Sequence, residues 1–271
     1  MIQQIECYKY QGTGNDFVVI DNRLKNISLT SEEIKWLCNR RFGIGADGLM
    51  LLESEIGIDF KMIYYNSDGR EGSMCGNGGR CITAFAKKLG IISSEVKFLA
   101  VDGIHHAKIN QEVVSLKMSD VREIELGADF FYLNTGSPHY IKFVSDLEHF
   151  DVVGEGKKIR YNSRFFEDGT NVNFIEKKDD ELFIRTYERG VENETLSCGT
   201  GVTAAAIVAG LTSQSTDKNN CKIKTLGGNL NVTFDRVLQN TFYNIWLEGD
   251  ANFVFKTHIN LPSKEILSIF S

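Results

Sequence analysis

The chain has 271 residues, of which 42% are hydrophobic and 24% charged, and its formal net charge is -6. This composition is typical of a soluble globular protein with one large domain or two smaller ones. The acidic balance excludes non-specific nucleic-acid binding, because there is no basic excess to neutralise phosphates. The opening residues do not resemble a secretory signal, and the longest apolar stretch, 203–211, is too short to span a bilayer. We therefore expect a cytoplasmic protein without nucleic-acid or membrane partners.

The first half predicts alternating strands and helices. Strands are expected at 7–10 and 17–21, and then a helix that begins at Thr30 and ends at Gly43. Thr30 and Glu33 form a capping-box pattern at its start, and one face carries Ile34, Leu37 and Cys38. Further along the half we expect strands at 48–52 and 59–65, a turn at 66–69, a helix behind Cys75 that stops at Gly90, and strands at 96–99 and 113–118.

The second half predicts a helix behind Cys198 whose residues are apolar nearly all round, which places it in a core. Strands are expected after it at 222–225, 230–234 and 243–248. The strand-like segment that ends at Met118 indicates a domain boundary near Asp120. This gives an N-terminal domain at 1–119 and a C-terminal domain at 120–251, and a C-terminal strand at about 252–271 can return to the first domain.

Two similar loops, MCGNGGRC at 74–81 and SCGTGV at 197–202, each place a cysteine before a glycine-rich turn and a helix. At the 123-residue offset that separates the two cysteines, identical residues recur along both halves. These pairs are Arg41 and Arg164, Phe42 and Phe165, Glu53 and Glu176, Tyr64 and Tyr187, Glu71 and Glu194, Gly76 and Gly199, and Gly78 and Gly201. The dipeptide Thr13-Gly14 recurs as Thr135-Gly136 at an offset of 122, which is one residue shorter than the offset between the two cysteines. A spacing held over so many residues predicts a duplicated fold unit rather than a solenoid repeat.

The six cysteines are expected to be reduced thiols, because a chain of this size without an export signal has no need of a disulfide framework. No C-x-x-C pair occurs, and the five histidines are not interleaved with cysteines at metal-ligand spacing, so we expect no metal site. Cys7 and Cys38 lie on apolar segments and are expected to be inert core residues.

Cys75 and Cys198 each lie at the start of a predicted helix, where backbone N–H groups lack internal partners and the helix dipole is positive. Such a position stabilises a thiolate, and the N–H groups can also hold a carboxylate. A single cysteine before a glycine-rich turn is more often structural than catalytic. Two of them at corresponding positions of a duplicated unit favour function. By the same reasoning alone, His139 could be a buried structural histidine, and the pair Glu188-Arg189 could be a surface ion pair.

The motifs QGTGNDFVVID, GIGADGLMLLE, NSDGREGSMCGNGGRC, NTGSPHYI, GTNVNFIE and YERGVENETLSCGTG occur in this order. This set resembles the diaminopimelate epimerase family, over residues 9 to about 210 and again in the closing segment LEGDANFVFKTHI. The resemblance implies an α/β fold of the α+β type. In it, two pseudo-symmetric domains each wrap a mixed sheet around a central helix, and the active site lies in the cleft between them.

The resemblance also implies the reaction, which is cofactor-independent epimerisation of LL-diaminopimelate to meso-diaminopimelate for bacterial lysine and peptidoglycan synthesis. It makes Cys75 and Cys198 the catalytic thiolate and thiol, and places His139 close to them. The substrate-binding residues that it implies are Asn15, Asn66, Gly76, Asn77, Asn171, Glu188, Arg189, Gly199 and Thr200. It also makes a homodimer the expected assembly, with diaminopimelate as the small-molecule partner.

The chain departs from the family pattern at three positions, Gly48, Ser137 and Asn193, which puts individual substrate contacts in doubt rather than the chemistry. Two alternatives stay open from the residues. One is another cofactor-free racemase, such as a proline racemase relative, which would need an apolar pocket in place of the polar residues Asn15, Asn66, Asn171 and Arg189. The other is a binding module whose glycine loops hold an anion while the cysteines sense redox state. Nucleotide binding by GNGGR is discounted, because the Walker lysine is missing.

Overall fold

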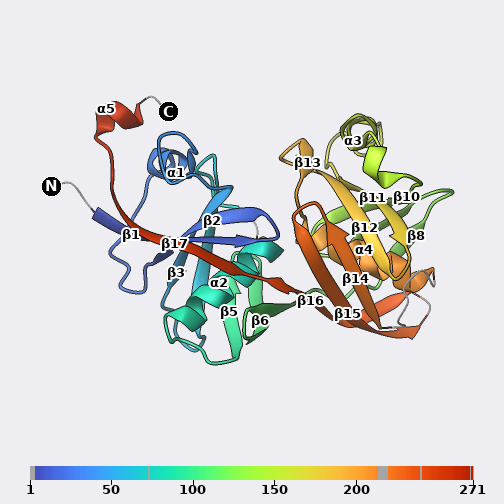
Figure 1. The fold of residues 1–271 in the computed structure, drawn as a ribbon, viewed down its shortest axis with the longest axis horizontal. Helices are drawn as coiled ribbons and strands as arrows, with labels where there is room; N and C mark the ends of the chain where they lie inside the picture. Colours follow the sequence, from blue (N-terminus) through green and yellow to red (C-terminus); the bar gives the residue numbers. More distant parts are fainter. Residues whose placement is uncertain (1–3, 73, 213–218, 239, 269, 271) are drawn as a thin grey trace. The chain divides into compact units, whose positions relative to one another are not determined.

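The computed structural model describes residues 4–72, 74–212, 219–238, 240–268 and 270, and Figure 1 shows its ribbon. The chain divides into two units. Unit 1 comprises Met1–Leu116 and Asp250–Ser271, and unit 2 comprises Lys117–Gly249. The change from unit 1 to unit 2 falls a few residues before the boundary at 119/120 that the sequence predicts. The C-terminal segment belongs to unit 1.

Unit 1 contains a mixed sheet whose hydrogen-bonded order is β17-β1-β2-β3-β4-β5-β6-β7. The β2–β3 and β4–β5 pairs are parallel, and the other pairs are antiparallel. The strands are β1 (Gln4–Gly12), β2 (Asn15–Asp21), β3 (Gly48–Glu53), β4 (Phe60–Asn66), β5 (Glu95–Ala100), β6 (Gly103–Asn110), β7 (Val113–Lys117) and β17 (Asn252–Asn260). The helices are α1 (Ser31–Cys38), α2 (Gly76–Lys88) and α5 (Lys264–Leu267).

Unit 2 repeats this order of strands as β8-β9-β10-β11-β12-β14-β15-β16, with β13 as an additional neighbour of β12. Its parallel pairs are β10–β11 and β12–β14, which occupy the same places in the order as in unit 1. The strands are β8 (Ile124–Leu126), β9 (Phe131–Asn134), β10 (Pro138–Phe143), β11 (Asn171–Lys178), β12 (Glu181–Glu188), β13 (Asn193–Thr195), β14 (Asn220–Thr225), β15 (Gly228–Leu238) and β16 (Thr241–Asp250). The helices are η1 (Leu147–His149), α3 (Val152–Arg160) and α4 (Gly199–Leu211).

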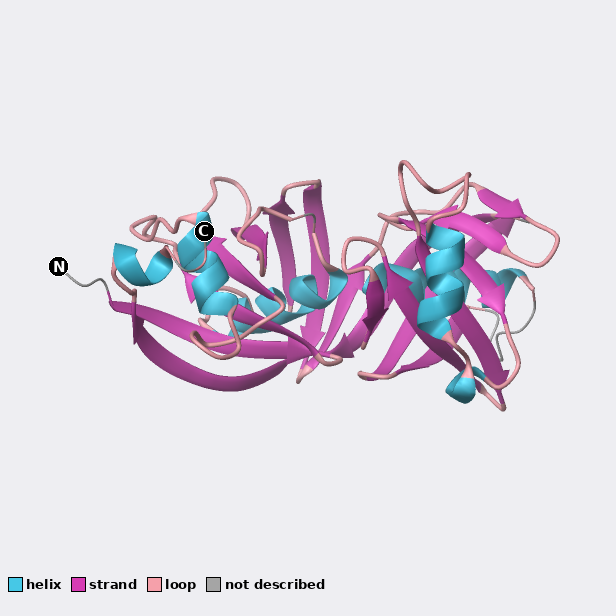
Figure 2. Cartoon of the chain, turned by 90° about the horizontal axis from the view of Figure 1, so that it is seen from above, coloured by secondary structure: helices cyan, strands magenta, loops and turns pink. Residues whose placement is uncertain are grey.

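One helix is central in each unit. α2 contacts β1, β2, β3, β6 and β17, and α4 contacts β9, β10, β11, β12, β14 and β15. Both helices have 13 residues, and their bounds differ by the 123-residue offset found in the sequence. Figure 1 labels α2 and α4 among the strands of their units, and Figure 2 shows that many of these strands are strongly curved. The predicted fold class, a duplicated mixed sheet around a central helix, is confirmed.

Both central helices are mostly buried, but the composition of their buried residues differs. Every residue of α4 from Gly201 to Ala209 is buried, as its continuous apolar run predicts. In α2 the buried face includes Ile82, Phe85 and Ala86, and the last turn carries lysines. Tyr8 of β1 packs against the ring of Phe85 with their centroids 4.8 Å apart. Each helix is therefore fixed along its length by the sheet around it.

The predicted end of the first helix at Gly43 is wrong. α1 keeps the predicted Thr30–Glu33 capping box but ends at Cys38, and Asn39 is its C-cap. Beyond it the chain turns back on the helix end, where Ile44 N and Gly45 N both donate to Leu37 O. A side chain at position 43 would begin 2.0 Å from Trp36 O, so Gly43 permits this close approach rather than stopping the helix.

The structure also contains elements that were not predicted from the sequence, namely β6, β8 to β13, η1, α3 and α5. The strand expected at about 252–271 ends at Asn260, and α5 follows it. Within the described ranges, no helix combines the length and the hydropathy that crossing a bilayer requires.

Candidate active site

Cys75 and Cys198 are the N-cap residues of α2 and α4, and both are half-buried. Both have extended backbone conformations, and neither side chain makes a capping hydrogen bond to its helix in the described structure. The first turns carry no acidic residue. The backbone N–H groups that follow each thiol therefore form a positively polarised end suited to an anion.

In unit 1, the predicted residues Asn15, Cys75 and Asn77 lie together. Asn15 Nδ2 donates to Asp47 Oδ2 at 2.7 Å, so the amide oxygen Oδ1 points away from Asp47. That oxygen lies 3.5 Å from Cys75 Sγ and 3.3 Å from Asn77 Nδ2. Asp47 is itself held by Arg40 at 2.8 Å. An amide oxygen only accepts hydrogen bonds, so this arrangement suits Cys75 as a thiol that donates.

Arg80, one turn further along α2, was not expected at the site. Its side chain is fully buried, and Nη2 donates to Thr13 Oγ1 at 3.2 Å and to Asn77 Oδ1 at 3.0 Å. Its Nε and Nη1 atoms have no hydrogen-bond partner among the described residues. Burial lowers the pKa of Arg80, and the neighbouring Cys81, Cys75 and Asp250 act in the opposite direction. Arg80 therefore fixes Asn77 and brings a cationic side chain close to Cys75.

Asn66 and Gly48 face each other where β4 and β3 pair, and Asn66 is exposed. The absence of a side chain at position 48 has a structural reason. A Cβ there would lie 2.5 Å from the Tyr64 ring and 2.7 Å from Tyr65 O. The Tyr64 ring therefore occupies the space next to this departure from the family pattern.

In unit 2, Cys198 lies beside Thr200 and His139. Cys198 Sγ is 3.5 Å from Thr200 Oγ1, and His139 Nε2 is 2.9 Å from the same hydroxyl. Burial lowers the pKa of His139 to about 3, with a further contribution from the positive charge of Arg189. His139 is thus a neutral imidazole at working pH, linked to the thiol through Thr200.

Ser137, the second departure, connects two predicted substrate-binding residues. Its Oγ accepts from Asn171 Nδ2 at 2.9 Å and from Arg189 Nη2 at 3.3 Å. Asn171 Oδ1 in turn accepts from Arg189 N at 2.9 Å. The three residues form one polar cluster that begins at the N-terminal end of β11.

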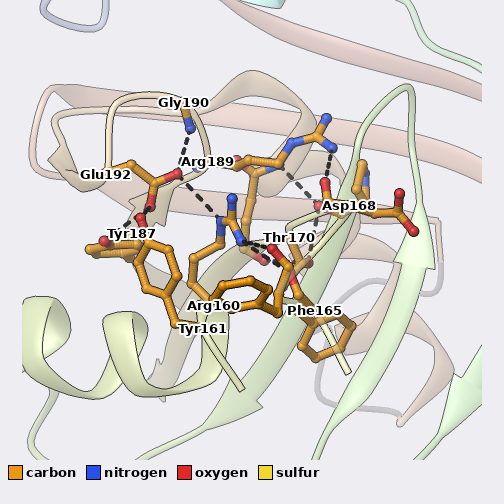
Figure 3. Close-up of polar contacts among 12 residues, drawn as sticks. Arg160, Tyr161, Phe165, Asp168, Thr170, Tyr187, Arg189, Gly190 and Glu192 are labelled. Carbon is orange, nitrogen blue, oxygen red and sulfur yellow. Dashed lines mark hydrogen bonds and ion pairs between the residues drawn. The ribbon is translucent and has the colours of Figure 1, made fainter. Parts of the chain in front are cut away.

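The loop after Arg189 is held by Glu192, as Figure 3 shows. The carboxylate of Glu192 accepts from Gly190 N at 3.1 Å, Tyr187 Oη at 3.1 Å and Tyr161 Oη at 3.0 Å. Glu192 and Gly190 both have positive φ, so these contacts stabilise a tight turn. The turn fixes the backbone from which the Arg189 guanidinium extends to Asp168 O at 2.9 Å.

Glu188 and the third departure, Asn193, are opposite each other where β12 pairs with β13. Thr195 Oγ1 donates to Glu188 Oε2 at 2.8 Å, and Asn193 Oδ1 accepts from Glu194 N at 2.8 Å. Asn193 thus serves the short β13 strand, which holds Glu188 in place.

The other thiols have a different environment. Cys7, Cys38 and Cys81 are buried, and burial raises the pKa of each to about 12. Cys221 is also buried. No cluster of histidine, cysteine or acidic side chains among the described residues could hold a metal ion.

In unit 1 the structure brings Asn15 and Asn77 to Cys75, and in unit 2 it brings Thr200, and through it His139, to Cys198. Asn66, Asn171, Glu188 and Arg189 lie in the separate arrangements described above.

Polar residues that the sequence did not single out also orient predicted ones. Asp47 accepts from Asn15, Arg80 donates to Asn77, Glu192 holds the turn after Arg189, and Asn173 Nδ2 lies 3.1 Å from His139 Nδ1. Asn173 could have been predicted from the sequence, because it lies two residues after Asn171 in a buried strand and therefore on the same face of that strand.

Comparison with known proteins extends these observations. A sequence model described as "Diaminopimelate epimerase" matches residues 7–123 and 131–254. A diaminopimelate epimerase of Flavobacterium psychrophilum is 53% identical over 94% of this chain and 100% of its own length. One of Chlorobaculum tepidum is 45% identical over 92% of this chain and 99% of its own length.

Solved structures share the fold at low sequence identity. A phenazine biosynthesis protein of the PhzF family from Bacillus anthracis has a TM-score of 0.73 and 15% identity, with 95% of this chain and 99% of that chain covered. A hydroxyproline epimerase from Agrobacterium vitis also has a TM-score of 0.73 at 15% identity, with 98% and 95% covered. The match over nearly the full length to curated relatives, together with the paired cysteine sites, shows that the chain belongs to the diaminopimelate epimerase family.

Proposed function

We propose that Cys75 and Cys198 are the two acid–base residues of a diaminopimelate epimerase, an isomerase that interconverts LL- and meso-diaminopimelate in lysine biosynthesis. The observation that carries this assignment is the occurrence, in both copies of a duplicated unit, of a half-buried cysteine at the N-cap of the central helix. One sulfur, as a thiolate, removes the α-proton. The other, as a thiol, delivers a proton to the opposite face, and the roles exchange in the reverse direction.

The chemical difficulty is that an amino-acid α-hydrogen is a very weak acid. As the proton leaves, negative charge accumulates on the adjacent carboxylate and must be met by preorganised donors. The N–H groups of Gly76, Asn77, Gly199 and Thr200 are suited to this, since they begin helices without acidic first-turn residues. One such donor can contribute about 3–4 kcal/mol. Holding both sulfurs near the α-carbon adds a positioning contribution of roughly 7–11 kcal/mol at its upper range.

The remaining predicted residues are proposed to recognise the second amino-acid centre of the substrate. Asn171 and Arg189, tied together through Ser137, are suited to a carboxylate, and Glu188 is suited to an ammonium group. Asn15 and Asn66 would add polar contacts from unit 1. The residues proposed from both units are polar, whereas a proline racemase would need an apolar pocket at the same place.

The proposal requires both units to contribute to one substrate. It also includes a homodimer working in the cytoplasm without a cofactor. Light scattering of the purified chain tests the dimer, and a monomeric mass at micromolar concentration would contradict it.

The test of the reaction uses purified chain, LL-diaminopimelate and D2O, without pyridoxal phosphate. We expect α-deuteration and formation of the meso isomer. Cys75→Ala and Cys198→Ala should each abolish epimerisation, and full activity in either variant would remove that residue from the mechanism.

Two matched controls separate chemistry from general loss of a thiol. Cys81→Ala alters the same helix as Cys75, and Cys221→Ala alters unit 2, and both should keep epimerisation because these buried thiols lie outside the proposed machinery. Binding of diaminopimelate without any deuterium incorporation would instead support the binding-module alternative.

A further inference from the structure

A continuous series of hydrogen bonds in unit 2 leads from β12 through β11 and β10 to the start of α4. Thr186 Oγ1 lies 2.9 Å from Asn173 Oδ1, and Asn173 Nδ2 lies 3.1 Å from His139 Nδ1. His139 Nε2 continues to Thr200, whose hydroxyl faces Cys198. Thr186, Asn173 and His139 are all buried, so water does not compete for these contacts.

The direction of each hydrogen bond can be assigned from one fixed point. Asn173 Nδ2 lies 3.1 Å from Tyr140 O, and a backbone carbonyl can only accept, so the NH2 group of the amide must face it. Asn173 Oδ1 then accepts from the Thr186 hydroxyl. The second hydrogen on Asn173 Nδ2 is directed at His139 Nδ1. In this orientation both hydrogens of the Asn173 amide donate and its oxygen accepts, so a flipped amide would lose these contacts.

The orientation of Asn173 sets the tautomer of His139. The imidazole is neutral at working pH, because burial first and the charge of Arg189 second disfavour its protonated form. Since Nδ1 accepts from Asn173, the single ring hydrogen is on Nε2, which donates to Thr200 Oγ1. The Thr200 hydroxyl must then turn its own hydrogen elsewhere, and Cys198 Sγ lies 3.5 Å away.

Unit 1 lacks this series of polar residues. In the parallel pair β10–β11, His139 is opposite Asn171, and in the equivalent pair β2–β3, Phe17 is opposite Gly48. The same register places Met50 where unit 2 has Asn173. Phe17 and Met50 are both fully buried. Cys75 instead faces Asn15 Oδ1, which can only accept.

We propose that Asn173 is a positioning residue that aims the Thr200 hydroxyl at Cys198 through the tautomer of His139, and so makes the two halves chemically unequal. Cys198 then rests as the thiolate base, because its sulfur receives a hydrogen bond. Cys75 rests as the thiol acid, because its S–H donates to Asn15 and this direct contact outweighs the charge of the nearby Arg80, which by itself favours a thiolate. The catalytic meaning of this inequality rests on the proposed function, whereas the inequality itself is a property of the unliganded chain.

The experiment measures alkylation of each thiol in the full chain without diaminopimelate. Iodoacetamide reacts with thiolates, so rates are followed from about pH 5 to about pH 10, with peptide mass spectrometry to separate Cys75 from Cys198. In the unsubstituted chain, we expect Cys198 to reach half of its maximal rate at least about one pH unit below Cys75. In Asn173→Met, which installs the residue that unit 1 has, the Cys198 midpoint should rise by about one unit while that of Cys75 stays unchanged.

Two further variants keep the test independent of folding defects. Thr200→Val removes only the hydroxyl and should raise the Cys198 midpoint by the same amount, with no further rise in the double variant. Thr186→Val is the matched control, because it removes a buried hydrogen bond from the same amide but leaves both donors of Asn173 in place. It should shift neither profile.

Equal midpoints for the two cysteines in the unsubstituted chain would overturn the proposal, as would equal shifts in Asn173→Met and Thr186→Val. Because no substrate is present, a failure of α-deuteration would overturn the proposed function and leave this result standing.

Discussion

Gly78 and Gly201 occupy equivalent positions in the first turns of α2 and α4, but an added methyl group would meet different neighbours. In Gly201→Ala, the Cβ would lie 2.4 Å from Asn173 Oδ1 and 3.3 Å from His139 Cε1. In Gly78→Ala, it would lie 3.2 Å from Met50 Sδ and 3.4 Å from Met62 Cε, which are flexible side-chain ends. The two alanine variants therefore compare the packing around Asn173 and His139 in unit 2 with the packing around Met50 and Met62 in unit 1.

The expected magnitudes follow from these contacts. Alanine in place of glycine within a helix contributes about 1 kcal/mol of stability in either unit. At position 201, overpacking costs about 1–3 kcal/mol, and displacing Asn173 weakens buried hydrogen bonds worth about 1 kcal/mol each. We expect Gly201→Ala to lose about 1–3 kcal/mol net, and Gly78→Ala to stay within about 1 kcal/mol of the parent.

Urea unfolding followed by tryptophan fluorescence can report each unit separately. The chain has two tryptophans, Trp36 in unit 1 and Trp246 in unit 2. Trp246→Phe gives the background for Gly78→Ala, and Trp36→Phe gives the background for Gly201→Ala. Equal losses of unfolding free energy in the two variants, or a larger loss for Gly78→Ala, would refute the reasoning.

Three further predictions concern the buried groups and the thiols. Arg80→Met should slow α-deuteration at least about tenfold, because Asn77 loses the guanidinium that fixes it. The same variant should change the unfolding free energy by less than about 1 kcal/mol, because burying the guanidinium already carries a desolvation cost. Burial lowers the pKa of folded His139 from 6.5 to about 3, so below pH 6.5 only the unfolded chain takes up a proton there. As the pH falls from 6.5 toward 3, stability should fall by about 1.4 kcal/mol per pH unit through this group, and His139→Phe should reduce that slope in acid unfolding titrations; an unchanged slope would be inconsistent with a buried neutral ring. Diamide oxidation without substrate should join Cys75 to Cys198 and abolish activity, which a reductant should restore, and linked peptides that pair other cysteines would argue against the shared site.

Much of the fold was predictable because the signals were local or repeated. The capping box at Thr30, the apolar run of α4 and the glycine after α2 each act within a few residues of chain. The 123-residue offset added the long-range information that one half repeats the other, and α2 and α4 follow it from end to end. Gly43 failed as a helix stop because its role is a close approach to Trp36 O, which local sequence does not encode.

The polar residues around the thiols were only partly predictable. Family resemblance pointed to Asn15, Asn171 and His139, but the contacts that orient them depend on strand register. Asn173 reaches His139 because β10 and β11 pair in parallel, and residues 34 positions apart become neighbours only through that pairing. Arg80 reaches Thr13 across 67 residues because α2 packs against β1 and β2, which flank Thr13.

The central claim is that two different sulfur atoms exchange protons with opposite faces of one α-carbon. It is tested most directly by following LL-diaminopimelate in D2O at early times and measuring deuterium in both recovered substrate and product. If one thiol removes the α-proton and the other, already exchanged with D2O, delivers a deuteron, the new stereoisomer carries α-deuterium from its first appearance. The recovered LL isomer then carries almost none. Deuterium entering recovered substrate as fast as it enters product would show a single shared base, and would contradict the assignment of one thiol to each unit.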